Sequence, residues 1–119
     1  MKILHQHQTE MYQRGPTCSA TEYPMHDPSL NIAIVSLSGR YPTSGHAVNT
    51  VCKEFVYVID GAGSVIVNGI VNKIAKGDMV LIEPNEPFYW DGHMTLIVPC
   101  TPAWYPEQYK TESINSRLK

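Results

Sequence analysis

The sequence predicts a single all-β domain, folded as a sandwich or closed barrel of antiparallel strands. From Asn31 onward, short segments rich in Val, Ile, Tyr and Thr follow one another, and Gly, Asn, Asp and Pro separate them at short intervals. Three of these separators have the composition of hairpin turns: DGAG at 60–63, NG at 68–69 and KGD at 76–78. With 119 residues, of which 43% are hydrophobic and 17% charged, the chain is long enough to bury a core as one domain.

The predicted strands occupy the middle of the chain, and two less regular segments flank them. Residues 1–30 are polar and interrupted by glycine and proline, so they are expected to form an irregular N-terminal arm or one or two edge strands. Residues 31–100 hold the predicted strands, with the sequences NIAIVSLS, HAVNTVC, EFVYVID, SVIVNGIVNKIA, MVLIE, FYWD and MTLIVP. Residues 101–119 form a C-terminal tail, in which PEQYKTESINSRL can form one or two helical turns after Pro106.

Charge and composition exclude several classes of partner. The net charge is −2 and no run of like charges occurs, so neither nucleic acid nor an anionic membrane is an expected partner. No apolar run is long enough to cross a bilayer, and the N-terminus lacks the apolar region of a signal peptide. Cys18, Cys52 and Cys100 are odd in number and widely scattered, which favours reduced thiols over a disulfide framework. We therefore expect a cytoplasmic protein.

Two sequence patterns resemble the motifs of the cupin superfamily, over about residues 31–100. In the second half of the first cupin motif, a Glu is followed after six residues by a Gly, and Glu54 is followed in this way by Gly61. The second motif begins with a Gly that Gly77 matches, and the segment GDMVLIEPNEPF follows its spacing. The resemblance implies a cupin-like antiparallel jelly-roll barrel. It also implies a homodimer, because cupin arms often cross to a neighbouring subunit and strand edges favour pairing.

The residues with which cupins usually bind a metal are largely missing. The two histidines of the first motif fall on Val48 and Thr50, or one residue earlier in an alternative count. The histidine of the second motif falls on Phe88, or on Tyr89 if one residue is inserted. Of the four usual ligands only Glu54 remains. We therefore expect the loop EPNEPFYW to be present without its metal ligand, and no metal cofactor.

Other residues offer one alternative metal site. A catalytic divalent metal needs about three protein ligands, and the candidates are His46, Cys52, Glu54 and His93. Side chains alternate along a strand, so His46 and Thr50 would share a face with Glu54 if the strand were unbroken. The spacing is not a metal-binding pattern. The alternative is that His46 lies in a turn at the strand entry and that Cys52 is a small buried hydrophobic residue.

Aromatic residues around Glu54 predict a ligand pocket inside the barrel. Phe88 and Trp90 alternate onto one strand face, and Tyr57 lies on the strand that follows Glu54. Aromatic rings with one or two polar groups suit a sugar ring or another flat polar metabolite. The residues expected to contact the ligand are Glu54, Phe88, Trp90, His46, Tyr57 and Thr50. The alternative is that the aromatic side chains fill the core in place of a metal.

Three functions remain open at this point. We favour a protein that binds a small polar metabolite, a sugar or an organic acid, in a barrel without metal. The second hypothesis is a metal-dependent enzyme of sugar or carboxylic-acid metabolism, isomerase-like or oxygenase-like, with a displaced site. The third is a structural dimer module with a packed barrel. No catalytic residue can be named, because no serine lies in a nucleophile elbow and a fold resemblance does not decide function.

Overall fold

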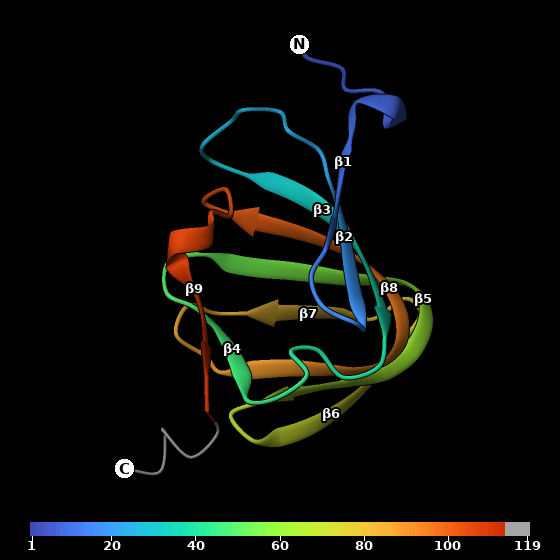
Figure 1. The fold of residues 1–119 in the computed structure, drawn as a ribbon, viewed down its shortest axis with the longest axis vertical. Coiled ribbons are helices and arrows are strands. Elements are labelled where there is room, and N and C mark those ends of the chain that lie inside the picture. The colour runs from blue at the N-terminus through green and yellow to red at the C-terminus, as the bar shows by residue number, and fades with distance from the viewer. Residues whose placement is uncertain (114–119) are drawn as a thin grey trace.

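The protein is built from antiparallel strands that curl into a barrel (Figure 1). The structure is a computed structural model and describes residues 1–113. Its elements are η1 (Gln6–Gln8), β1 (Glu10–Gln13), β2 (Cys18–Glu22), β3 (Asn31–Ser38), β4 (His46–Asn49), β5 (Lys53–Val67), β6 (Ile70–Ala75), β7 (Met79–Ile82), β8 (Phe88–Thr101), η2 (Pro106–Gln108) and β9 (Tyr109–Glu112). The predicted all-β class is confirmed. Within residues 1–113, no helix is long and apolar enough to cross a membrane.

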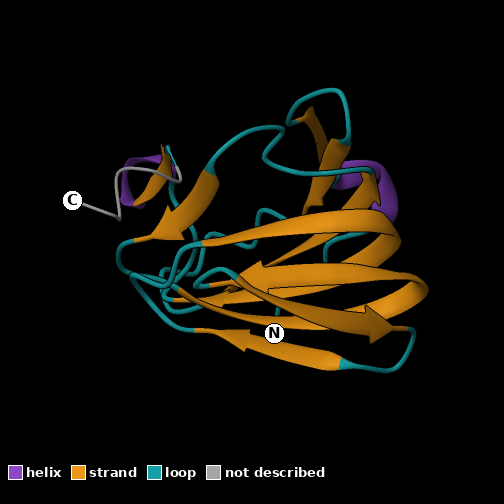
Figure 2. Cartoon of the chain, turned by 90° about the horizontal axis from the view of Figure 1, so that it is seen from below, coloured by secondary structure: helices purple, strands orange, loops and turns teal. Residues whose placement is uncertain are grey.

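Two long strands form the centre of the sheet. β5 and β8 pair antiparallel from Lys53–Thr101 to Val67–Phe88, with one irregularity midway. β7 and β6 pair with the first and second halves of β5 on its other side, and β3 pairs with the second half of β8. Figure 2 shows these strands curving together around the interior.

Alternate residues of the two long strands face the interior. In β8 the buried residues are Phe88, Trp90, Met94, Leu96, Val98 and Cys100. The first half of β5 repeats the pattern with Glu54, Val56 and Val58. Side chains alternate along a strand, and burial of apolar surface stabilises the fold. One face of each strand therefore supplies the core, and Glu54 enters that core together with its apolar neighbours.

The first thirty residues contribute two strands to the sheet. β1 and β2 form a hairpin from Glu10–Glu22 to Gln13–Ser19, and β2 pairs with β3 along its whole length. β1 is the edge strand at this end of the sheet. The hairpin turn between them carries Arg14, whose backbone N–H donates to the Cys18 carbonyl at 2.8 Å.

The C-terminal tail differs from the helical prediction. Only η2 is helical, and the chain then continues as β9, which pairs with β4 from Asn49–Tyr109 to His46–Glu112. Of the one or two helical turns predicted, one is present as η2, and residues 109–112 form a strand because they complete the ladder beside a free strand edge. The remainder of the predicted helical segment, 114–118, lies outside the described residues.

Gln108 joins this tail to the start of β5. Its side chain is buried, and its Oε1 atom accepts the backbone N–H groups of Val51 and Cys52 at 3.2 Å each. Its Nε2 atom donates to Asn49 Oδ1 at 3.0 Å. The Gln108 side chain therefore provides the hydrogen-bond acceptor for two backbone N–H groups where the chain bends between β4 and β5.

Replacing Gln108 with leucine is expected to lower the free energy of unfolding by about 2–3 kcal/mol, because two backbone N–H groups in or near the core lose their acceptor. Urea denaturation measures this loss. Glu107, the preceding residue, is exposed, so Glu107→Leu is the matched control and is expected to change stability by less than about 0.5 kcal/mol. Equal losses in the two variants would show that the Gln108 amide does not support the bend.

Candidate ligand-binding site

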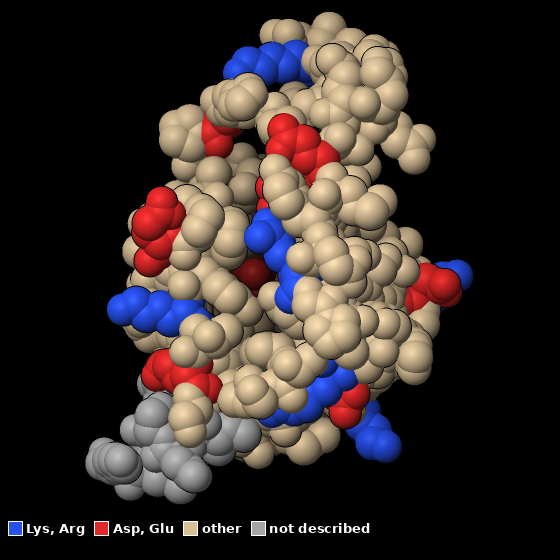
Figure 3. Space-filling view, in the orientation of Figure 1, with Lys and Arg blue, Asp and Glu red and all other residues tan. Residues whose placement is uncertain are grey.

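A cavity of about 180 Å³ lies inside the barrel. The small and apolar residues Ala20, Ala33, Val35, Leu96 and Val98 form part of its wall. Figure 3 shows its opening, with a basic side chain at the edge and an acidic side chain deep inside. The polar groups of the cavity are a buried carboxyl, two phenols and an ion pair, and each is described in turn.

Glu54 brings a carboxyl group into the cavity lining. It lies on β5 between its register partners Ile82 on β7 and Cys100 on β8, and only 9% of the residue is exposed. Among the described contacts its hydrogen-bond donor is the Cys100 thiol at 3.9 Å, which is a weak partner. Burial raises the pKa of Glu54 to about 7, and the Asn49 amide and the Cys100 thiol oppose this rise. Near neutral pH the carboxyl is therefore able either to donate or to accept a hydrogen bond.

Asn49 places an amide group next to this carboxyl. It lies on β4 and is fully buried, and its Oδ1 atom accepts from Gln108. Its Nδ2 atom has no hydrogen-bond partner, although the amide is near enough to lower the pKa of Glu54. A buried donor without a partner costs about 1–3 kcal/mol. We call Glu54 and Asn49 the inner polar pair: a carboxyl that lines the cavity and a buried amide beside it that does not.

Aromatic side chains line the walls of the cavity. Phe88 and Trp90 pack edge to face with ring centroids 6.1 Å apart, and Trp104 and Tyr109 pack at 5.7 Å. Burial raises the pKa of the Tyr41 and Tyr109 phenols, and the two hydroxyls lie near enough to influence each other's pKa. Both tyrosines therefore remain neutral at physiological pH and present hydroxyl groups inside an otherwise apolar wall.

The loop before β8 determines the position of Phe88. Within the stretch EPNEPFYW, the Glu86 carboxylate accepts the backbone N–H of Glu83 at 2.8 Å. Asn85 adopts a positive φ of 68° and donates its backbone N–H to the Asn49 carbonyl at 2.7 Å. The loop is thus tied to β4, and it places an aromatic ring where the cupin motif has a histidine.

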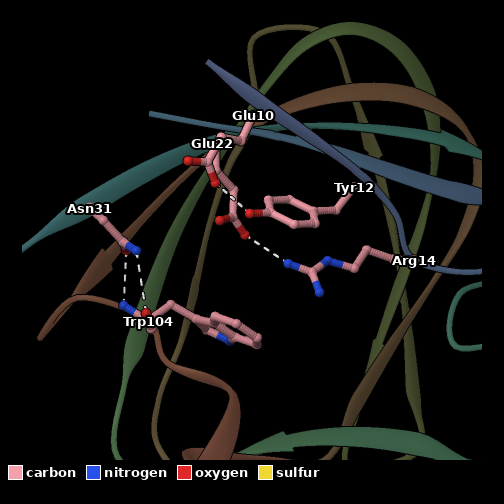
Figure 4. A network of polar contacts seen from close by, with 6 residues as sticks. All are labelled: Glu10, Tyr12, Arg14, Glu22, Asn31 and Trp104. Atoms are coloured by element: carbon pink, nitrogen blue, oxygen red, sulfur yellow. Dashed lines mark hydrogen bonds and ion pairs between the residues drawn. The ribbon is translucent and has the colours of Figure 1, made fainter. Parts of the chain in front are cut away.

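An ion pair lies at the cavity opening, in the group that we call the rim: Arg14, Glu22 and Trp104. Arg14 Nη2 lies 2.7 Å from Glu22 Oε1. The guanidinium also lies over the rings of Tyr12 and Trp104, at 4.8 and 5.5 Å from their centroids. The Asn31 side chain holds the Trp104 backbone in place (Figure 4). Its Oδ1 atom accepts the backbone N–H of Trp104 at 2.9 Å, and its Nδ2 atom donates to the backbone carbonyl of Trp104 at 3.4 Å.

The structure brings together half of the residues predicted to contact a ligand. Those that line the cavity are Glu54, Phe88 and Trp90. Those that do not are His46, Thr50 and Tyr57. The Thr50 hydroxyl instead donates to the Gln108 carbonyl at 2.7 Å. Tyr57 is 38% exposed, because its odd-numbered position puts it on the outer face of β5.

A break in the chain explains the position of His46. The shared face of His46 and Glu54 required an unbroken strand over 46–54, and this condition is not met, because β4 ends at Asn49 and a bend precedes β5. In β4, Ala47 pairs with Phe88 and Asn49 pairs with Tyr109. Paired residues share a sheet face, and both partners line the cavity. The odd-numbered residues of β4 therefore lie on the inner face of the sheet, although neither lines the cavity, and His46 lies on the opposite face.

The alternative metal ligands do not converge. No three His, Cys, Asp or Glu side chains of the described residues are arranged to hold a metal ion. His93 is exposed on β8, His46 faces away from the cavity, and the Cys52 thiol contacts the Ala103 carbonyl at 3.9 Å. Of the four candidates, Glu54 alone lines the cavity.

Sequence reasoning missed several residues of the site. Four of them line the cavity: Arg14, Glu22, Tyr41 and Tyr109. The fifth, Asn49, is buried beside Glu54 and does not line the cavity. A signal existed for Asn49, because the alternative count of the first cupin motif places a histidine position there. The others come from segments far from both motifs, and no local pattern marks them.

Comparison with known proteins settles the fold. No protein-family model and no curated protein sequence matches the chain. Solved structures do match: the nucleoside dehydratase Pac13 of Streptomyces has a TM-score of 0.86 at 18% identity and covers 95% of this chain and 92% of its own. An RmlC-like cupin from Shewanella frigidimarina has a TM-score of 0.69 at 19% identity, covering 83% and 88% of the two chains. This chain has the cupin fold. The resemblance found in the Glu54 and Gly77 motifs is confirmed.

A further cupin-fold match is KdgF from a Halomonas species, with a TM-score of 0.67 at 16% identity, covering 86% of this chain and 94% of its own. Three of the Pac13 structures are single-residue variants with uridine bound. At these sequence identities the structural similarity establishes the fold alone, so the function has to be inferred from the residues that line the cavity.

Glu54 is expected to make the protein less stable as the pH rises from about 4.5 to 7. Its folded pKa of about 7 lies above the ordinary value of 4.5, so the folded state binds more protons in this window. The stability that Glu54 contributes is complete below pH 4.5 and is lost as the pH rises through 7, a change on the order of 3 kcal/mol. Urea denaturation at a series of pH values measures it.

The isosteric variant Glu54→Gln is the control for this measurement, because other groups also titrate. Subtracting its pH profile from that of the wild type isolates the Glu54 contribution. Two profiles of the same slope between pH 4.5 and 7 would show that the Glu54 carboxyl is solvated and titrates normally.

Proposed function

We propose that this cupin protein binds a small polar metabolite, a sugar or an organic acid, in its barrel without the metal that cupins usually hold. One observation carries the proposal: the buried Glu54 carboxyl lines the cavity, where its polar neighbours are the Asn49 amide and the weakly bonding Cys100 thiol. A carboxyl group has about four acceptor sites, so these neighbours leave hydrogen-bonding capacity unused. A ligand hydroxyl or N–H group in the cavity would use it.

The walls of the cavity support a ring-shaped ligand. Phe88, Trp90, Trp104 and Tyr109 surround it with aromatic surface, which packs well against a sugar ring or a flat heterocycle. Pac13, similar in fold, has been seen with uridine, which combines both kinds of ring. Sugars, sugar acids and nucleosides are therefore the first molecules to test.

The two alternative functions have less support. A packed barrel conflicts with a cavity of about 180 Å³, which is several times the roughly 30 Å³ that one water occupies in the liquid. A displaced metal centre would need ligands that converge, and the candidate set His46, Cys52, Glu54 and His93 does not converge within the described chain.

We also propose that the protein forms a homodimer. In support, Tyr57, Met79 and Leu81 expose apolar side chains on the outer face of β5 and β7, where Tyr57 and Met79 are register partners. Exposed apolar patches commonly mark contact surfaces. Sedimentation equilibrium over a range of concentrations would give the mass in solution, and a monomer at all concentrations would exclude the dimer.

Phe88→Ala is expected to weaken ligand binding beyond its effect on stability. The ring lines the cavity and is also buried, so the variant is expected to lose about 3–5 kcal/mol of stability and most of its affinity for sugar or nucleoside probes. Calorimetric titration below the unfolding temperature measures the affinity. Ile82→Ala is the matched control, because Ile82 is equally buried but does not line the cavity; it should lose stability and keep its affinity. Equal affinity in the two variants would favour a packed barrel.

Protein purified without an affinity tag is expected to contain far less than one equivalent of Zn, Fe, Mn or Ni per chain. The reason is that Val48, Thr50 and Phe88 occupy the positions at which cupins have histidines. Elemental analysis by mass spectrometry measures the content. About one equivalent of metal, lost in the His46→Ala variant, would support the enzyme with a displaced metal site instead.

A further inference from the structure

Arg14 is held at the opening of the cavity by contacts that leave most of its hydrogen-bonding capacity unused. Its guanidinium lies over Tyr12 and Trp104 and pairs with Glu22 (Figure 4). A guanidinium carries a planar fork of N–H donors, yet within residues 1–113 only its Nη2 atom has a protein acceptor, which is Glu22 Oε1. The aromatic contacts fix the plane of the fork, and the remaining donors are available to a ligand at the opening.

The positive charge of Arg14 affects titratable groups inside the cavity as well as at the rim. Arg14 lowers the pKa of the Cys18 thiol and of the Tyr41 hydroxyl, although burial raises both overall. Both residues line the cavity. A negative group on a bound ligand would therefore be attracted to Arg14 before and after it enters.

The partner that Arg14 already has is replaceable. The side chains of Arg14 and Glu22 are each 33% exposed, so Glu22 can turn into water without leaving a buried charge unpaired. Exposed ion pairs of this kind contribute little to stability. A carboxylate on a ligand offers the same planar geometry and the same charge as Glu22, and it matches the guanidinium fork in two parallel hydrogen bonds.

The surrounding charges favour a carboxylate over a phosphate. The Tyr12 hydroxyl donates to the Glu10 carboxylate, and both Glu10 and Glu22 act electrostatically on that tyrosine. Counted together with the neighbouring Glu10, the charges around the rim are two carboxylates and one guanidinium, which sum to a net negative charge. A phosphate monoester carries between about one and a half and two negative charges at neutral pH, so it meets more repulsion here than a carboxylate does.

We propose that Arg14 binds the carboxylate of the ligand, in exchange for Glu22, and that the ligand class is a hydroxylated ring bearing one carboxylate, such as a sugar acid. The ring lies among the aromatic walls, its hydroxyls reach the Glu54 carboxyl, and the carboxylate remains at the rim. This inference rests on the proposed function, because it names the ligand class of the same cavity.

The test uses two matched series of probes that differ in one substituent. The first is methyl glucopyranoside, its 6-carboxylate and its 6-phosphate, and the second is uridine, its 5′-carboxylate and its 5′-phosphate. Calorimetric titration of the wild type is expected to show the carboxylate of at least one series bound about tenfold more tightly than the neutral member, as one charge-assisted contact provides. Arg14→Gln should abolish that preference, measured as the ratio of the affinities for the carboxylate and the neutral member in the same variant.

The Glu22→Gln variant distinguishes two roles of the Arg14–Glu22 ion pair: competition with the ligand for Arg14, and structural support of the rim. If Glu22 competes with the ligand for Arg14, the variant binds the carboxylate more tightly than the wild type. If the ion pair merely holds the rim in place, the variant binds all probes more weakly, and the proposal is overturned. Arg14→Lys, which keeps the charge but loses the fork, should show an intermediate preference and remains available if Arg14→Gln does not fold.

The remaining outcomes are distinguishable. Neutral probes that bind as well as carboxylates would overturn the role of Arg14 and leave the proposed function standing. Phosphates that bind more tightly than carboxylates would show that the ligand class is wrong. Failure of every probe in both series to bind would overturn the proposed function, and this inference with it.

Discussion

The pairing of β5 with β8 is the constraint on which the rest of the structure depends. The two strands stay in register along most of their length and turn alternate residues to the interior. Through this pairing Glu54 lies beside Cys100, although 46 residues separate them in the chain. The smaller strands and both terminal segments complete the ends of the barrel that these two strands define, so every residue of the site is positioned relative to them.

The same pairing creates the electrostatic problem of the site. It removes a carboxyl group from water, which costs free energy unless the group is paired or neutralised. Among the described residues, the fold brings the Asn49 amide and the Cys100 thiol to Glu54 but no cation, and burial still raises the pKa of the carboxyl. A small molecule with a hydroxyl or N–H group would lower the cost of burying Glu54, which is the physical basis for interpreting the cavity as a binding site.

The sequence predicted the part of the site that local spacing determines. Glu54, Phe88 and Trp90 were found because one motif and one strand alternation place them on the inner face. His46 was misplaced because a bend between two strands reverses the alternation, and no residue type in the segment marks that bend. Arg14 and Tyr109 were missed because they reach the cavity through long-range pairing of a hairpin and a tail, which composition does not reveal.

The two polar regions of the cavity depend on different parts of the fold. Glu54 lies on a central strand, so a substitution there changes the hydrogen bonding of the interior and the stability of the barrel together. Arg14 lies in the turn between β1 and β2, and Glu22 is the last residue of β2, in the hairpin at the edge of the sheet. Both side chains are partly exposed, and substitutions at such positions usually have small effects on stability. If the proposed ligand binds, substitutions at the rim would change the charge that the cavity prefers while the barrel stays intact. On that proposal the interior would determine which ring is held, and the hairpin would determine which charged group that ring carries.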